Sequence, residues 1–221
     1  MPPFDLLPRL LDGLRVTIIL VCAAGALGLG VSFIAGLARL SSRRLIRTAA
    51  ATYVEVFRGT SALVQVFFWA FVAPLLGVDL PLFAAGVVAL GLNVGAYGSE
   101  VVRGAILAVD KGQREAALAL NMPHWLMMRR IVVPQALLAM LPPFGNLLIE
   151  LMKGTALVSL ISITELTFAG RQILQTEGLA RRDETYLLTL ILYILLAIPM
   201  ILAVRRLERR AGRGLGLGVV R

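Results

Sequence analysis

Residues Glu115 to Pro134, EAALALNMPHWLMMRRIVVP, decide how the rest of the chain is interpreted. The segment is polar, basic and interrupted by a proline, and a long apolar run lies on each side of it. The residues from Lys111 onward favour a helix, because Ala, Leu, Glu and Arg are good helix formers. Asn121 and Pro123 then end it, since the residue before a proline leaves helical geometry and Asn tolerates the left-handed conformation. The pattern predicts a stiff helix–turn–helix on a membrane surface, over about residues 110–131.

The composition is that of an integral membrane protein. The 221 residues are 58% hydrophobic and 16% charged, with a mean hydropathy of +0.85, whereas soluble domains average about 25% charged residues. The net charge of +9 does not indicate nucleic acid, because the Lys and Arg residues lie between apolar spans. Cys22 is the only cysteine and His124 the only histidine. The chain therefore offers no internal disulfide and no His or Cys metal cluster. The sequence contains no ATP-binding loop, so we expect it to bind no cofactor itself.

Five stretches are long and apolar enough to cross a bilayer, which takes about 20 residues as a helix. The predicted spans are Val16–Leu40; Ala62–Leu76, extended at its start by Tyr53–Ser61; Leu82–Leu107; Ile131–Leu151; and Tyr186–Val204. Thr155–Gly170 is apolar but short and contains Glu165. We expect it to be a partly embedded or surface-packed helix on the outer side. The fold class is thus all-α integral membrane, with residues 1–221 forming one domain whose core is about 12–207.

The distribution of basic residues predicts the orientation. Sixteen Lys and Arg residues lie on one side of the spans: Arg39, Arg43, Arg44, Arg47, Arg58, Arg103, Lys111, Arg114, Arg129, Arg130, Arg205, Arg206, Arg209, Arg210, Arg213 and Arg221. Six lie on the other: Arg9, Arg15, Lys153, Arg171, Arg181 and Arg182. The positive-inside rule then places the N-terminus outside, the C-terminus in the cytoplasm and the Glu115 loop on the cytoplasmic side.

The Glu115 loop resembles the EAA coupling loop of ABC importer permeases. That family's pattern is Glu-Ala-Ala, three residues, Gly, nine residues, Ile, one residue, Leu, Pro. This chain matches it at Glu115, Ala116, Ala117, Ile131 and Pro134, with Asn121 in place of Gly and Val133 in place of Leu. Asn is the non-glycine residue most able to take a positive φ, so the turn is expected to survive.

The resemblance extends over most of residues 12 to 207 and is closest to the polar amino acid branch. It is carried by three further segments: Tyr53 to Gln65, with Glu55, Phe57-Arg58-Gly59-Thr60 and Ser61 in place of Pro; Ala96 to Gln113, with Tyr97, Glu100 and Arg103-Gly104; and Leu141 to Ser159, with Gly154 in place of an acidic residue. Within the branch, KGTALVSLISITELTF is similar to permeases for ectoine and hydroxyectoine.

The resemblance implies a transport subunit without catalytic residues. It would form half of a translocation path for a polar amino acid or related compatible solute in the bacterial cytoplasmic membrane. Its implied partners are a dimeric ABC ATPase that binds ATP and Mg, an extracellular or periplasmic solute-binding protein, and a second permease, identical or homologous. The Glu115 loop would be the contact with the ATPase.

Charged residues within membrane spans are costly, about 2.5–3.5 kcal/mol each on insertion scales, so each needs a partner or a function. The spacing of three residues recurs in Glu55 with Arg58, Glu100 with Arg103, and Glu150 with Lys153. We expect the first two to be internal ion pairs, with gating as the alternative. The third could meet both charges of a zwitterionic solute or could simply reach the interface. Gln65, Asn93 and Tyr97 either line the path or bond between helices.

Two other classes of membrane protein are alternatives to an importer subunit. A stand-alone secondary transporter or channel is the main alternative, although such folds commonly contain internal repeats and this sequence shows none. A membrane enzyme is disfavoured because the sequence has no His pair, Cys cluster or Gly-x-Ser-x-Gly motif.

Overall fold

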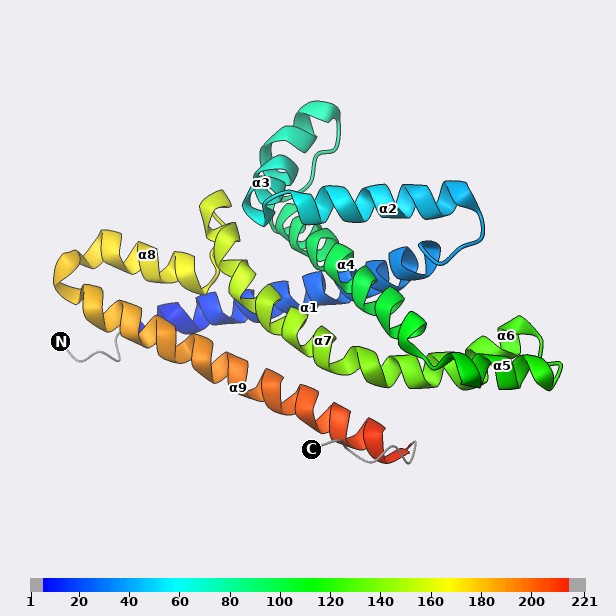
Figure 1. Ribbon diagram of the computed structural model, residues 1–221. Helices are drawn as coiled ribbons and strands as arrows, with labels where there is room; N and C mark the ends of the chain where they lie inside the picture. The colour runs from blue at the N-terminus through cyan, green and yellow to red at the C-terminus, as the bar shows by residue number, and fades with distance from the viewer. Residues whose placement is uncertain (1–5, 215–221) are drawn as a thin grey trace.

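The structure is a computed structural model that describes residues 6–214, and all of its regular elements in that range are helical (Figure 1). The elements are α1 Leu7–Ala38, α2 Arg44–Gly59, α3 Ala62–Phe67, a π-helical turn Phe68–Val72, a 3₁₀ turn Ala73–Leu76, α4 Leu82–Ala108, α5 Lys111–Ala119, α6 His124–Met127, a π-helical turn Met128–Val132, α7 Val133–Gly154, a 3₁₀ helix Thr155–Ile161, α8 Leu166–Glu177, a 3₁₀ turn Leu179–Arg181 and α9 Arg182–Gly214.

Four helical stretches are long and apolar enough to span a membrane, and a bent pair makes a fifth. The four are Leu7–Ala38, Leu82–Ala108, His124–Ile161 and Arg182–Arg209. The pair consists of Arg44–Gly59 and Ala62–Leu76, which meet at 106°. These are the five predicted spans, but the first begins nine residues earlier than expected, and the second is sharply broken where a continuous extension was expected. Residues 215–221 of the basic tail lie outside the described residues.

The long contact between α1 and α4 is made by small residues on both helices. A Cβ on Gly98 would lie 2.1 Å from Ser32 Oγ, and one on Gly91 would lie 2.8 Å from a Leu27 methyl group. Gly28 would in turn meet the Gly91 carbonyl at 3.0 Å. Such close approach is the usual way in which membrane helices associate. The Gly91, Gly95 and Gly98 stripe therefore serves helix packing.

The break between α2 and α3 is held by side-chain amides. Gln65 Nε2 donates at 2.8 Å to the Phe57 carbonyl, one of the backbone groups that the end of α2 leaves open, and at 2.8 Å to Thr60 Oγ1. Asn93 Nδ2 of α4 donates to Gln65 Oε1 at 3.1 Å. Of the two expected roles for Gln65 and Asn93, the structure therefore shows bonding between helices.

The stretch Thr155–Gly170 is two pieces rather than one helix, which corrects the sequence expectation. The 3₁₀ helix ends at Ser162, whose φ is 64°, and α8 begins after Glu165. The Glu165 carboxylate is fully buried and accepts bonds from the backbone N–H groups of Thr167 and Phe168, each at 2.8 Å. Tyr193 Oη of α9 donates to it at 3.0 Å. Burial raises the pKa of this carboxyl, while these three bonds act in the opposite direction.

Glu165 therefore joins α8 to α9, and its removal should be costly. We expect Glu165→Ala to lower the free energy of unfolding by about 2–3 kcal/mol, because it removes both the helix cap and the buried carboxylate to which Tyr193 donates. Glu184→Ala is the matched control: its carboxylate meets Arg181 at 3.2 Å on the surface and should contribute less than about 1 kcal/mol. Thermal unfolding of the purified variants in detergent would measure both, and equal losses would contradict the capping role.

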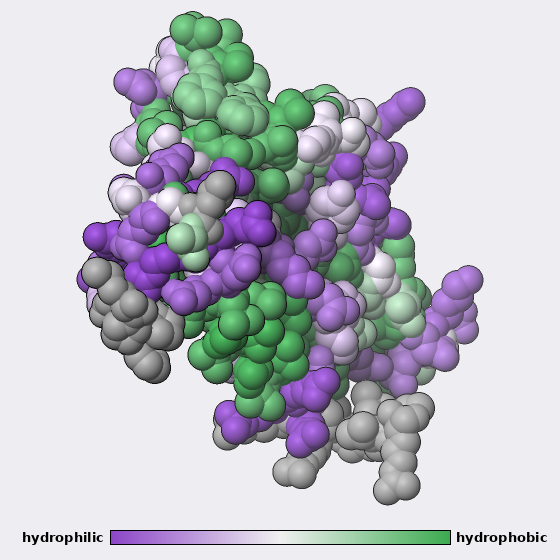
Figure 2. Space-filling model, turned by 90° about the vertical axis from the view of Figure 1, so that its left-hand side faces the viewer, coloured by the Kyte–Doolittle hydropathy of each residue, from purple (hydrophilic) through white to green (hydrophobic). Residues whose placement is uncertain are grey.

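The outside of the bundle is largely apolar. Phe71, Leu75 and Leu76, at the end of the second span, are 52%, 84% and 70% exposed, and Figure 2 shows hydrophobic surface at this end of the molecule. Only 6% of the apolar 18-residue segment within α9 is buried. Surfaces of this size are characteristic of contact with lipid or with another subunit.

Candidate functional site: a surface loop and a polar cluster

The Glu115 loop is a compact helix–turn–helix at one end of the molecule (Figure 1). Asp110 caps α5, since its Oδ1 accepts from the Gly112 N–H at 2.6 Å. At the other end Asn121 has φ 57°, and the Met122 N–H donates to the Ala117 carbonyl at 3.0 Å. This is the left-handed closure that the sequence predicts for Asn121.

The inner face of the loop is packed onto the membrane helices. Ala117 is 1% exposed and Met127 5%, and both belong to one apolar cluster with Val102, Ile106 and Val132. The Arg114 guanidinium donates to the Ile106 carbonyl at the end of α4. These contacts fasten the loop to α4 and to the start of the fourth span.

The outer face combines one carboxylate with large apolar side chains. Glu115 and Ala116 are exposed, and Leu118, Leu120 and Trp125 are 61%, 77% and 61% exposed. Exposed apolar groups of this size on a polar loop indicate a protein contact. Of the predicted coupling residues, Glu115, Ala116 and Asn121 are on this face. Ala117 is buried and Ile131 and Pro134 are half-buried, so these three contribute less to the exposed face.

The conformation of Asn121 gives a direct test of the turn. We expect Asn121→Gly to leave stability unchanged, because glycine takes a positive φ freely. Asn121→Val should cost about 1–2 kcal/mol, the usual penalty of the left-handed region for a residue with a Cβ. Thermal unfolding would compare the two variants, and a loss in Asn121→Gly equal to that in Asn121→Val would show that the Asn side chain, not its backbone, matters.

A polar cluster lies where α1, α2 and α4 meet, with Glu100 at its centre. Glu100 Oε2 accepts from Arg103 at 3.0 Å, which is the pair expected from the sequence. Its Oε1 also accepts from Arg39, at the end of α1, and from Arg58 of α2 at 3.4 Å. The Arg58 guanidinium lies 5.4 Å from the ring centre of Tyr97. One carboxylate thus holds three arginines from three helices.

The expected pair of Glu55 with Arg58 does not form, because Arg58 is drawn across to Glu100 and Tyr97. Glu55 instead lines a cavity of about 630 Å³ with Arg39, Arg47 and Arg103. Within residues 6–214, Glu100 is the one carboxylate in contact with this group of arginines. The cluster therefore keeps an excess of positive charge beside an open cavity.

Glu150 and Lys153 are also not paired with each other; both are exposed on α7. Together with Ala139, Pro142 and Asn146 they form one exposed stripe along that helix, called here the polar stripe. The spacing of three or four residues places all five on one face. Polar and charged groups in a membrane span rarely face lipid, so the polar stripe faces protein or water.

Sequence reasoning missed three features of these sites. Arg39 was assigned to topology alone, although it is a partner of Glu100. Trp125 and Leu120 were not singled out as a contact surface. Tyr53, whose hydroxyl donates to the Leu92 carbonyl at 2.6 Å, ties α2 to α4. Of these three features, only the contact surface had a signal in the sequence: Leu120 and Trp125 occur with Glu115 on one short pair of helices.

The fold and these sites define a class: a five-span membrane subunit with a surface loop packed onto its helices and a polar face along one span. The model of the family described as "Binding-protein-dependent transport system inner membrane component" matches residues 28–213. The chain belongs to this family and is a permease subunit of an amino-acid ABC importer, which is a transport component and not an enzyme.

Individual proteins agree with that assignment. A probable amino-acid ABC transporter permease of Sinorhizobium fredii is 41% identical over 205 residues, which cover 90% of this chain and 84% of that protein. The permease of the glutamine transport system of Escherichia coli is 37% identical, covering 92% and 93%. The crystal structure of an amino acid ABC transporter with histidines superposes with a TM-score of 0.85 at 35% identity, covering 92% and 94%.

Proposed function

We propose that this chain is the permease of an importer driven by a separate dimeric ABC ATPase, and that the exposed face of the Glu115 loop is where the ATPase docks. The observation that carries the proposal is the two-sided loop: Ala117 and Arg114 fix it to α4, while Glu115, Leu120 and Trp125 face outward. A stiff element transmits a domain motion that a flexible loop would absorb. ATP and Mg bind to the ATPase, and this chain supplies the coupled movement of its helices.

The polar stripe on α7 supports a paired permease. Asn146, Glu150 and Lys153 are exposed in a single chain, which is costly in lipid. A second permease, identical or homologous, covers this face in the proposed complex and leaves a water-filled path between the two subunits. An extracellular or periplasmic binding protein delivers the solute to its outer end.

The proposed solute is a polar amino acid or a related compatible solute, with ectoine included as a candidate. Two observations favour this class. Relatives are named for amino-acid and glutamine transport, and Glu150 and Lys153 offer one group of each sign to a zwitterion. Competition for uptake by glutamine, arginine and ectoine would rank the three.

Reconstitution in liposomes tests the whole proposal. The permease is assembled with the ATPase and binding protein from the neighbouring genes, and uptake is measured with ATP, without ATP and without the ATPase. We expect uptake only with ATP and all components present. Uptake that persists without the ATPase and follows an ion gradient would establish the alternative, a stand-alone secondary transporter.

The orientation is tested separately by reporter fusions. The charge distribution places the C-terminus and the Glu115 loop in the cytoplasm and the N-terminus outside. A reporter active only in the cytoplasm should therefore work when fused after Arg221 and fail when inserted after Asp79, in the loop before α4. The reverse pattern would put the Glu115 loop outside the cell and exclude it as an ATPase contact.

A further inference from the structure

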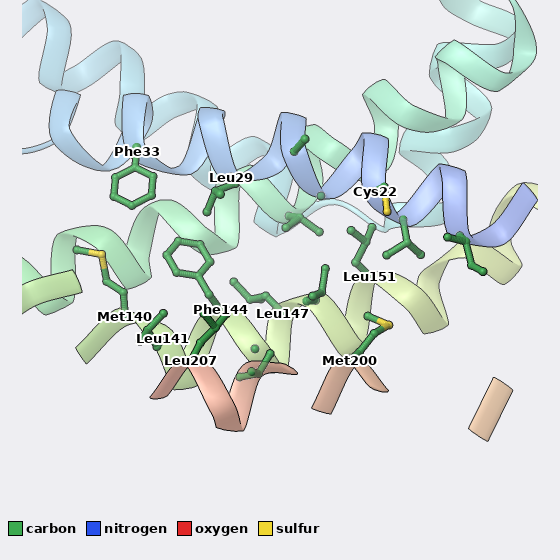
Figure 3. A pocket seen from close by; sticks show the side chains of 18 of the residues that line it. Cys22, Leu29, Phe33, Met140, Leu141, Phe144, Leu147, Leu151, Met200 and Leu207 are labelled. Carbon is green, nitrogen blue, oxygen red and sulfur yellow. The ribbon is translucent and has the colours of Figure 1, made fainter. Parts of the chain in front are cut away.

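A crevice of about 600 Å³ between α1, α7 and α9 is lined by apolar side chains (Figure 3). Leu29 and Phe33 of α1 face Phe144 and Leu147 of α7 there. Such a surface offers no hydrogen bonds to the charged groups of an amino acid, and burying those groups without partners is costly. The crevice therefore does not suit a polar solute.

The cavity of about 630 Å³ beside the Glu100 cluster has the opposite character. Polar and charged residues dominate its lining: Arg39, Arg47, Thr48, Thr52, Glu55 and Arg103. Arg47, Ala51 and Glu55 are spaced by four residues, so they share one face of α2. Charged groups in a membrane span face water or protein instead of lipid. This face of α2 therefore borders a wet cavity.

Glu55 lines this cavity without meeting any of its arginines. Arg39 and Arg103 are bound to Glu100 instead, and the guanidinium of Arg47 donates to a backbone carbonyl in the turn before α2 at 3.0 Å. Among the residues that the structure describes, the Glu55 carboxylate makes no ion pair. Charges of opposite sign that border one cavity and stay apart leave room for a ligand between them.

The signs of these charges select the class of ligand. A simple anion would be attracted by the arginines but repelled by Glu55, and a simple cation would be repelled by the arginines. A zwitterion satisfies both, because a carboxylate forms strong bonds with guanidinium groups and an ammonium pairs with a carboxylate. The arginines in the lining outnumber its one carboxylate. An amino acid with a neutral side chain is therefore favoured over one with an additional positive charge.

We propose that this cavity binds one α-amino acid, with its ammonium at Glu55 and its carboxylate at the guanidinium groups of Arg47 and Arg103. In the proposed orientation the cavity lies in the cytoplasmic half of α2, so it holds solute at the inner end of the path. The inference rests on the proposed function for the class of solute and for this orientation. Because the test measures binding to the permease, it is independent of ATP-driven uptake, and the failure of either can be told apart.

The test is the reaction rate of a thiol placed in the cavity, in the purified permease–ATPase complex without binding protein or ATP. Cys22→Ala removes the native thiol and Thr52→Cys supplies the new one, at an exposed position in the lining. L-Glutamine should slow its reaction with a neutral maleimide saturably, by about tenfold at a concentration of about ten times Kd, because only the empty site reacts. Ser42→Cys, exposed before α2 and outside the lining, is the matched control and should react at an unchanged rate.

Analogues of glutamine separate a zwitterion site from a simple anion site. N-acetyl-L-glutamine lacks the ammonium and the α-amide of L-glutamine lacks the carboxylate. Neither should protect the thiol at concentrations at which L-glutamine does, and L-arginine should protect less well than L-glutamine. Equal protection by L-glutamine, N-acetyl-L-glutamine and inorganic phosphate would make the cavity an anion site and overturn the proposal.

Substitutions test the two charged groups of the site. Glu55→Gln should weaken protection by L-glutamine about tenfold, the loss expected for one hydrogen bond between charged groups, and it leaves no ion pair broken. Arg47→Gln should act similarly, whereas Arg44→Gln, exposed on the same helix but outside the lining, should not. Unchanged protection in the folded Glu55→Gln or Arg47→Gln variant would overturn the proposal. So would the absence of protection by L-glutamine at its highest soluble concentration. If neither variant folds, the analogue comparison on the Thr52→Cys protein decides.

Discussion

Glu115→Lys should abolish uptake while leaving the amount of folded permease in the membrane unchanged. Glu115 is exposed on the outer face of α5 and makes no ion pair within residues 6–214, so folding does not depend on it. At the proposed ATPase interface the change reverses a charge. Close charge pairs at interfaces are worth about 1.5–7 kcal/mol, and the low end of this range already weakens association more than tenfold. Co-purification of the ATPase and solute-stimulated ATP hydrolysis would measure the effect.

The matched control is Asp79→Lys. It makes the same change of charge at an exposed site in the loop between the second and third spans, which the proposed orientation places outside the cell. We expect ATPase association in this variant to equal that of wild type. If Glu115→Lys also transports normally, the docking surface lies elsewhere. Restoration by an acidic residue in place of a basic one on the ATPase would identify the partner group.

Glu100→Gln should lower the amount of folded protein. The change leaves Arg39, Arg58 and Arg103 close together without their shared carboxylate. The arginine side chains are 14%, 39% and 35% exposed, so solvent softens the repulsion. We therefore expect a loss of about 3 kcal/mol, the low end of the cost of leaving buried charges unpaired. Membrane yield and thermal unfolding would both report it.

The way in which the loss is rescued distinguishes this cluster from a simple pair. Adding Arg103→Gln to Glu100→Gln should recover only part of the stability, because Arg39 and Arg58 still repel each other. Adding Arg39→Gln as well should recover more. Complete recovery with Arg103→Gln alone would show that the i,i+3 pair is the whole interaction. Normal folding of Glu100→Gln with lost transport would instead place Glu100 in the solute path.

The sequence predicted the features that depend on local patterns. Apolar runs located the spans, and Asn121 before Met122-Pro123 located the turn, because both follow from residue type and spacing. The Glu100 and Arg103 pair was also accessible, since i,i+3 contact is a property of one helix.

The features that were missed depend on distant segments. Arg39 reaches Glu100 across 61 positions, and Glu165 is bound by Tyr193 across 28. The absence of the Glu55 and Arg58 pair has the same cause: a better partner arrives from another helix, which spacing within α2 cannot reveal. At the 106° break before α3, the long-range contribution is the bond from Asn93 of α4 to Gln65, which spacing within the second span cannot reveal.

The polar stripe on α7 also bears on how much of this protein a cell keeps. In the proposed complex, a newly inserted copy carries Asn146, Glu150 and Lys153 uncovered until the second permease binds. Membrane proteases that clear orphan subunits would find a substrate in that interval. We expect the half-life of the chain to shorten when it is expressed alone and to lengthen when the rest of the transporter is made with it, so that stoichiometry is set by degradation as much as by synthesis.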